Sequence, residues 1–207
     1  MDNEKSILRE KIASIQKSLQ TTIGVIVCGK DCIGIFFKSK APLSEEYETG
    51  DGRTLYVWGA GGSTPASGSF EIILSQAINA FATELFSRRD LNLRFIQDLI
   101  SSYMAGRFYD RKSEMPVPME FALAEKRPDQ LQFAIIDYHG EMKPFGVDDK
   151  YIIFGCTNKK IQEKVAKRLE TFQNLDLKKL TEAVEELFDE LGFEGAFFKG
   201  GFCGKMG

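Results

Sequence analysis

The chain has 207 residues, of which 43% are hydrophobic and 28% are charged, and its formal net charge at pH 7 is −3. This composition is typical of a globular protein that can bury a sizeable core, and the small negative charge gives no field that would attract nucleic acid. The N-terminus is polar and no apolar run reaches about 18 residues, so we expect a cytoplasmic protein with no signal sequence and no membrane contact.

The segment 1–20 is predicted to be an amphipathic helix, most clearly over residues 4–20. Its apolar residues recur at helical spacing and charged residues cover the other face, which indicates that one side packs against a partner. Asn3 is in position to cap the first turn. The partner is either the rest of this chain or a neighbouring subunit. The apolar residues of this helix are Leu8, Ile12, Ile15 and Leu19.

The stretch from 21 to 38 is predicted to be a β-hairpin, because two β-branched, apolar runs are joined by Gly29-Lys30-Asp31. The runs are apolar almost throughout rather than alternating, so both faces of the hairpin are expected to be covered, as in the central strands of a layered domain. Cys28 and Cys32 flank the turn and could face each other. We favour free thiols that pack as small apolar side chains.

A polar segment, 39–53, follows and is interpreted as a loop or an excursion at the edge of a sheet. Residues 54–58 are predicted to be a third strand, which the small residues from Gly59 onward should end. A strand, a glycine-rich turn and a helix start can hold phosphate through free backbone N–H groups. The alternative, which we favour, is a tight packing turn. The candidate ligand-binding residues are Gly61, Gly62, Ser63 and Thr64.

Two helices are predicted next, one starting near Ser67 or Ser69 and one capped by Asp90. The apolar face expected on the second consists of Leu91, Phe95, Leu99 and Tyr103.

The C-terminal half is predicted to contain a block of strands, two helices and a last strand. The strands are expected at 121–124, 131–138, 151–154 and 193–198. The first helix should place Ile161, Val165, Leu169 and Phe172 on one face, and the second Leu180, Val184, Leu187, Phe188 and Leu191.

Helices therefore come in pairs between blocks of strands, whereas a βαβ fold would alternate single helices with strands. Paired helices that cover the outer faces of two stacked sheets would explain why the strands are apolar on both sides. We predict an α+β fold, a four-layer αββα sandwich with two stacked antiparallel sheets plus an N-terminal helix. Residues 1–207 are expected to form one domain.

Three motifs occur in order along the chain: Thr21–Val25 with Gly29–Cys32, Trp58–Gly61 before a long helix, and Ile135–Gly140 followed by Phe154–Thr157. Together they resemble the proteasome subunit family, which has the N-terminal-nucleophile hydrolase fold. The helix at 4–20 is similar to one that non-catalytic α-type subunits carry before their first strand, whereas catalytic β-type subunits carry a propeptide that is removed.

The resemblance implies a test for catalysis, since the family's nucleophile is an amino-terminal threonine whose own α-amine acts as base. Aligning the Gly-Lys-Asp turns puts Thr22 at the nucleophile position. Lys38 then falls where the family has an acid, and Thr54 where it has a lysine. Aligning on Gly24 instead also loses the constellation. No catalytic residue is therefore expected, except Thr22 if the chain is processed.

The segment after strand 151–154 offers one more candidate, because Cys156 precedes a helix start where a thiol pKa can be lowered. Lys159 and Lys160 could gather an anion there, although we favour an exposed pair of charges that opposes the helix dipole. His139 has no assignable catalytic partner. With one histidine and four cysteines that form no CxxC pair, no metal site is expected, and we expect no cofactor.

The function expected from these features is that of a non-catalytic, proteasome-subunit-like scaffold that forms a homo-oligomer or binds related subunits. One alternative is an N-terminal-nucleophile hydrolase in unprocessed form, either a threonine peptidase or an amidohydrolase. The other is a phosphate- or nucleotide-binding module at the Gly59–Thr64 turn.

Overall fold

The computed structural model describes residues 2–19, 22–39, 43–48, 52–61, 92–109, 119–127, 131–137, 139–146 and 148–203. The helices are α1 (Asp2–Leu19), α3 (Leu93–Tyr109), α4 (Lys159–Leu169) and α5 (Leu177–Glu190). The strands are β1 (Ile23–Gly29), β2 (Cys32–Ser39), β3 (Leu43–Glu48), β4 (Thr54–Gly61), β5 (Met119–Lys126), β6 (Leu131–Ile136), β7 (Met142–Phe145), β8 (Tyr151–Phe154) and β9 (Ala196–Cys203).

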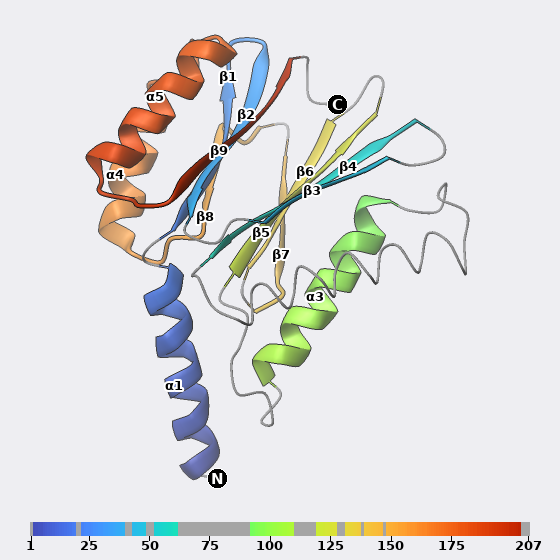
Figure 1. Ribbon diagram of the computed structural model, residues 1–207, viewed down its shortest axis with the longest axis vertical. Coiled ribbons are helices and arrows are strands. Elements are labelled where there is room, and N and C mark those ends of the chain that lie inside the picture. Colours follow the sequence, from blue (N-terminus) through green and yellow to red (C-terminus); the bar gives the residue numbers. More distant parts are fainter. Residues whose placement is uncertain are drawn as a thin grey trace.

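The strands form two antiparallel sheets. The first sheet has the order β8-β1-β2-β9, and the second has the order β3-β4-β5-β6-β7. Helices α4 and α5 cover the outer face of the first sheet, while α3 lies against β5 and β6 on the outer side of the second (Figure 1). The predicted α+β sandwich of two stacked antiparallel sheets with an N-terminal helix is therefore confirmed.

The hairpin of β1 and β2 is the central pair of the first sheet, as predicted, and its burial explains its sequence. Val25 and Val27 of β1 pack toward α4 and α5, whereas Ile26 between them packs toward the second sheet. Successive residues of a strand point to opposite faces. Because both faces are covered, a strand here must be apolar at every position, which accounts for the continuous run.

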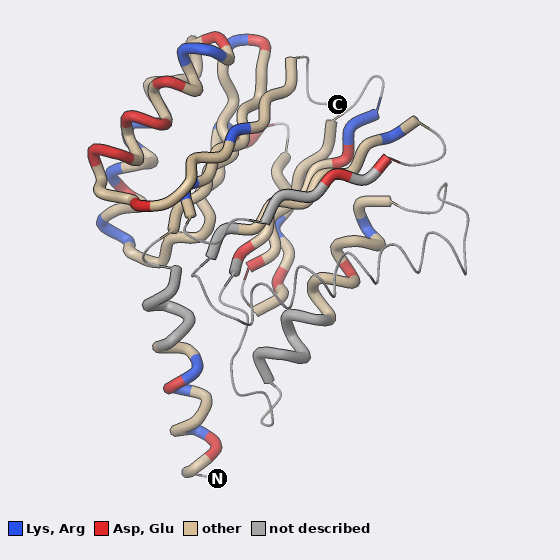
Figure 2. Tube along the Cα trace, viewed as in Figure 1, with Lys and Arg blue, Asp and Glu red and all other residues tan. Residues whose placement is uncertain are grey.

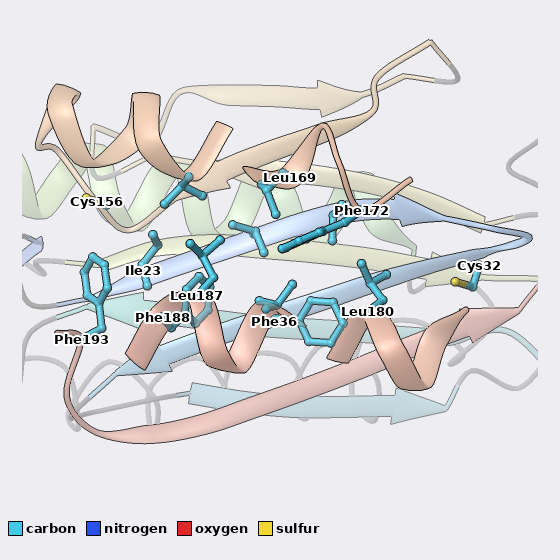
Figure 3. Close-up of a cluster of buried hydrophobic side chains, with 14 residues drawn as sticks. Ile23, Cys32, Phe36, Cys156, Leu169, Phe172, Leu180, Leu187, Phe188 and Phe193 are labelled. Carbon is cyan, nitrogen blue, oxygen red and sulfur yellow. The ribbon is translucent and has the colours of Figure 1, made fainter. Parts of the chain in front are cut away.

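The core between the first sheet and its two helices is filled by large side chains (Figure 3). Phe36 of β2 is fully buried there and stacks with Phe197 of β9, and Phe188 of α5 makes edge contacts with the ring of Phe197. Full burial of one Leu, Val or Phe side chain contributes roughly 1.5–3 kcal/mol. The stripe predicted for α5 is buried at Leu180, Val184, Leu187 and Phe188.

The charges of α4 and α5 lie along the two helices, whereas the strands of the first sheet carry few charges (Figure 2). Each helix starts at a capping side chain: Asn158 accepts hydrogen bonds from the backbone of Lys160 and Ile161, and Asp176 accepts one from Lys179.

No helix in the described part of the chain has both the length and the apolar character needed to cross a membrane.

One expectation about the second sheet was wrong and one was met. Strand β4 does not end at Gly59, because Gly59 and Gly61 continue the ladder opposite Phe121 and Met119 of β5. Of the two interpretations of the polar segment 39–53, the excursion at the edge of a sheet is confirmed, since the segment contains the edge strand β3, paired with β4. A neighbouring strand supplies hydrogen bonds whatever the side chain, so strand pairing overrode the weak β propensity of these residues.

Element boundaries also differ from prediction, and one strand was not predicted. Asn92, not Asp90, caps α3, since its Oδ1 accepts a hydrogen bond from the Phe95 N–H at 2.9 Å. The last strand begins at Ala196 rather than at residue 193, and β7 was not predicted. The hairpin turn has two residues, because Gly29 pairs with Cys32. The helix expected from residue 67 or 69 lies outside the described residues.

The register of α3 differs as well. Among the side chains of α3 that the structure describes, the most buried hydrophobic ones are Leu93, Ile96 and Ile100, so the face against the second sheet is turned from the one predicted.

Candidate functional site

Thr22, the residue that the resemblance would place at the nucleophile position, is fully buried at the start of β1. Its Oγ1 donates a hydrogen bond to the carbonyl oxygen of Gly155 at 2.6 Å. In the intact chain the nitrogen of Thr22 belongs to a peptide bond, so it cannot act as the base that an amino-terminal threonine needs. The hydroxyl therefore serves to hold the segment that follows β8.

Glu120 holds the same segment from the second sheet. Its side chain, at the start of β5, accepts a hydrogen bond from the Gly155 N–H. Gly155 has φ 72, a left-handed conformation that glycine adopts without strain. The peptide groups on both sides of Gly155 are therefore fixed by one residue from each sheet, and we call these three residues the Gly155 junction.

The electrostatics of the junction are unusual for a carboxyl group. Burial raises the pKa of Glu120 to about 7; the Gly155 N–H opposes this shift, nearby Asp137 adds to it and Lys143 reduces it. Asp137 is itself buried and accepts hydrogen bonds from the backbone N–H groups of His139 and Glu141, both at 2.9 Å. A carboxyl group that titrates near neutrality can exchange a proton under physiological conditions.

The Cys156 thiol lies beside this junction but is not activated, which contradicts the less favoured alternative of a lowered pKa. Burial raises its pKa, and the charge of Glu120 adds to this effect, while a hydrogen bond from the Asn158 backbone works against it. Cys156 is only 3% exposed and belongs to the core under α4 and α5. The thiol is therefore a packing group.

No protein-family model matches this sequence, and no curated protein matches it.

The remaining predicted site residues are spread apart. Lys38, which the resemblance would place where an acid is expected, forms an ion pair with Asp189 of α5 on the outer side of the first sheet. Gly61 lies at the end of β4, opposite Met119. The other candidate ligand residues, Gly62, Ser63 and Thr64, lie outside the described residues, so phosphate binding by that turn stays a prediction.

Sequence reasoning did not single out Glu120. The only signal was an acidic residue immediately before the apolar run 121–124, where a solvated strand end would be the ordinary interpretation. Its role depends on the contact with Gly155, which lies 35 residues later in the chain, directly after strand β8 of the first sheet. No metal-binding group of three or more His, Cys, Asp or Glu side chains occurs within the described ranges.

Proposed function

We propose that the protein is a non-catalytic scaffold subunit, resembling those of the proteasome family, that self-assembles or binds related subunits through α1. The observation that carries this proposal is the position of α1. The helix extends away from the two sheets, with the N-terminus at its far end (Figure 1).

The exposed apolar residues of α1 support an assembly role. Leu8 is 36% exposed and Ile7 is 37% exposed, while Ile12 is half-buried. Full burial of an exposed side chain is worth roughly 1.5–3 kcal/mol, and a residue that is about one third exposed gains part of this when a second chain covers it. Covering the side of the helix that carries Leu8 and Ile12 would therefore stabilise an assembly. The side chains of Ile15 and Leu19 are not among those described.

The state of the nucleophile position supports a non-catalytic role. Thr22 follows α1 in the chain, so its nitrogen is part of a peptide bond, and its hydroxyl donates a hydrogen bond to the Gly155 carbonyl. Lys38 carries a positive charge where an acid is needed and is paired with Asp189. Activation of a threonine hydroxyl requires an adjacent base.

The test compares two double variants of α1 by light scattering. Leu8→Asp with Ile12→Asp places two charges on the apolar stripe and should dissociate the wild-type oligomer into folded monomers. Ser6→Asp with Ala13→Asp makes the same charge change on the opposite side of the helix, by its period of about 3.6 residues, and should leave the oligomer intact. A wild-type protein that is monomeric at high concentration would contradict the proposal.

The second candidate function is an N-terminal-nucleophile hydrolase in unprocessed form. One observation favours it. Glu120, whose pKa is raised to about 7, forms a hydrogen bond with Gly155, and Thr22 forms a hydrogen bond with the same residue. Intact-mass measurement decides between the two functions, since a hydrolase of this kind must release an N-terminal threonine.

A further inference from the structure

A cavity of about 520 Å³ opens at the start of α3, away from the Gly155 junction. Its charged lining consists of Arg53, Arg94, Arg127 and Glu125. We propose that this cavity binds a small organic anion carrying two negative charges, of the phosphate monoester class. The volume is in the range of pockets for small organic ligands and is larger than a bare phosphate ion needs.

The charge balance of the lining favours a dianion. Glu125 is 1% exposed, and its carboxylate accepts hydrogen bonds from Arg53 Nη1 at 3.2 Å and Arg127 Nε at 2.6 Å. Burial acts to raise the pKa of Glu125, but the Leu93 N–H and the two arginines outweigh it, so the net pKa is lowered and the group stays ionised. Among the described residues that line the cavity, three arginines stand against one glutamate, which gives this part of the lining a formal charge of +2.

Glu125 also fixes the start of α3 against the strands. Its Oε2 accepts a hydrogen bond from the Leu93 N–H at 2.9 Å. The first turn of α3 therefore faces the cavity with the positive end of the helix dipole, which adds to the attraction for an anion. By binding both Arg53 and Arg127, the carboxylate keeps two guanidinium groups at the cavity wall.

The side chain of Gln97 is a second indication of a ligand, and it does not depend on the charges of the lining. It lies one turn into α3, lines the cavity and is only 9% exposed. Its side-chain amide has no hydrogen-bond partner among the residues that the structure describes, whereas buried polar groups in proteins are nearly always paired. A phosphate oxygen in the cavity would accept the hydrogen bond that the Gln97 amide can donate.

Two guanidinium groups have donors to spare for the anion. Arg94 is exposed and forms no ion pair within the described ranges. Arg127 uses Nε for Glu125, and its side chain is 42% exposed, so its terminal nitrogens can reach a ligand. Guanidinium groups bind phosphate with paired hydrogen bonds, which gives the site its preference for this class of anion.

The experiment titrates phenyl phosphate into the full chain by calorimetry and thermal shift, with inorganic phosphate and phenol in parallel. Phenyl phosphate should bind and raise the melting temperature, more weakly as salt increases. Arg94→Ala and Gln97→Leu should each weaken binding about tenfold, since each removes a hydrogen bond to a charged oxygen. Arg168→Ala removes an exposed arginine from α4, across the two sheets, and should bind as the wild type does.

Three results would overturn the proposal: no binding of phenyl phosphate at about 10 mM, equal affinity in all four proteins, or equal affinity for phenol and phenyl phosphate. Inorganic phosphate that binds as tightly as phenyl phosphate would refute the organic part of the ligand class. The melting temperature of each unliganded variant shows that it is folded. Gln97→Leu should not lower it, because the change removes a buried amide that has no described partner.

Discussion

The ring of Phe154 on β8 fills the space beside Gly24 of β1, so that a Cβ added to Gly24 would lie 2.2 Å from the ring's Cζ atom. The two residues are direct partners in the β1–β8 ladder, and Phe154 is 1% exposed. The ring has therefore no room to move without disturbing the core between the sheets. At this position a glycine is required by packing.

Gly24→Ala is expected to lower the free energy of unfolding by about 1–3 kcal/mol, the usual cost of overpacking a tight core. Urea denaturation measures the change. The control is Gly146→Ala, where the nearest atom to the added Cβ would be Asp149 Oδ2 at 3.5 Å, an ordinary contact. Equal stabilities for the two variants would show that the Phe154 ring yields at no cost.

The layered fold was predictable because the burial of a strand or helix determines the pattern of apolar residues within that segment. The β1–β2 run is apolar at consecutive positions because both faces are covered, and the stripe on α5 repeats at helical spacing. The sequence of strand β7 shows no such pattern. It is a four-residue edge strand that contains Pro144, a residue that usually argues against a strand and is tolerated at an edge.

The sites were less predictable than the fold, since each depends on contacts between distant segments. Glu120 and Glu125 are both acidic residues of β5 and are alike in sequence. Burial and Asp137 raise the pKa of the first, while hydrogen bonds from Leu93 and two arginines lower the pKa of the second. Only the tertiary structure determines which neighbours each carboxyl meets, so their opposite behaviour could not be predicted from spacing.

Protonation of Glu120 should make stability depend on pH. The folded state keeps this proton up to about pH 7, whereas the unfolded chain releases it near 4.5. Between these values the folded state binds more protons, so the contribution is fully present below pH 4.5 and is lost as pH rises through 7. The loss can reach about 3 kcal/mol.

Glu120→Gln tests this dependence, because the amide stays neutral and its oxygen can still accept from the Gly155 N–H. The difference in unfolding free energy between the variant and the wild type should grow in favour of the variant from pH 5 to pH 8. Titrating groups that do not interact with Glu120 cancel in this difference. A difference that is the same at every pH would mean that Glu120 has an ordinary pKa.

Oxidation should cross-link Cys32 to Cys203. All four cysteines are free, and Cys32 lies directly opposite Cys203 in the β2–β9 ladder, whereas Cys28 is opposite Ile33. Opposed residues of antiparallel strands have Cα atoms about 4.5–5.5 Å apart, within the range of a disulfide. Burial raises the pKa of the Cys32 thiol, and Cys203 adds to the effect, so the reaction should be faster at alkaline pH.

Peptide mapping after treatment with diamide identifies the link. Cys28→Ser should still form it and Cys203→Ser should not. A link between Cys28 and Cys32, the pair that flanks the hairpin turn, would refute the prediction based on strand register.

Replacement of Thr22 should alter stability but not chemistry. Thr22→Val keeps the shape of the side chain and leaves the Gly155 carbonyl without the hydrogen bond now made at 2.6 Å. The unfolding free energy should fall by about 1–3 kcal/mol, the cost of an unsatisfied buried acceptor. Thr171→Val is the matched control, since the Thr171 hydroxyl donates a hydrogen bond to the Arg168 carbonyl at an exposed position, where the cost should be under about 0.5 kcal/mol.

Thr22 is also not expected to take part in processing or catalysis. Through long incubation the wild type and Thr22→Val should each keep the full mass of their own sequence, and neither should hydrolyse peptides. Loss of the residues before Thr22 from the wild type, blocked in the variant, would instead establish the hydrolase.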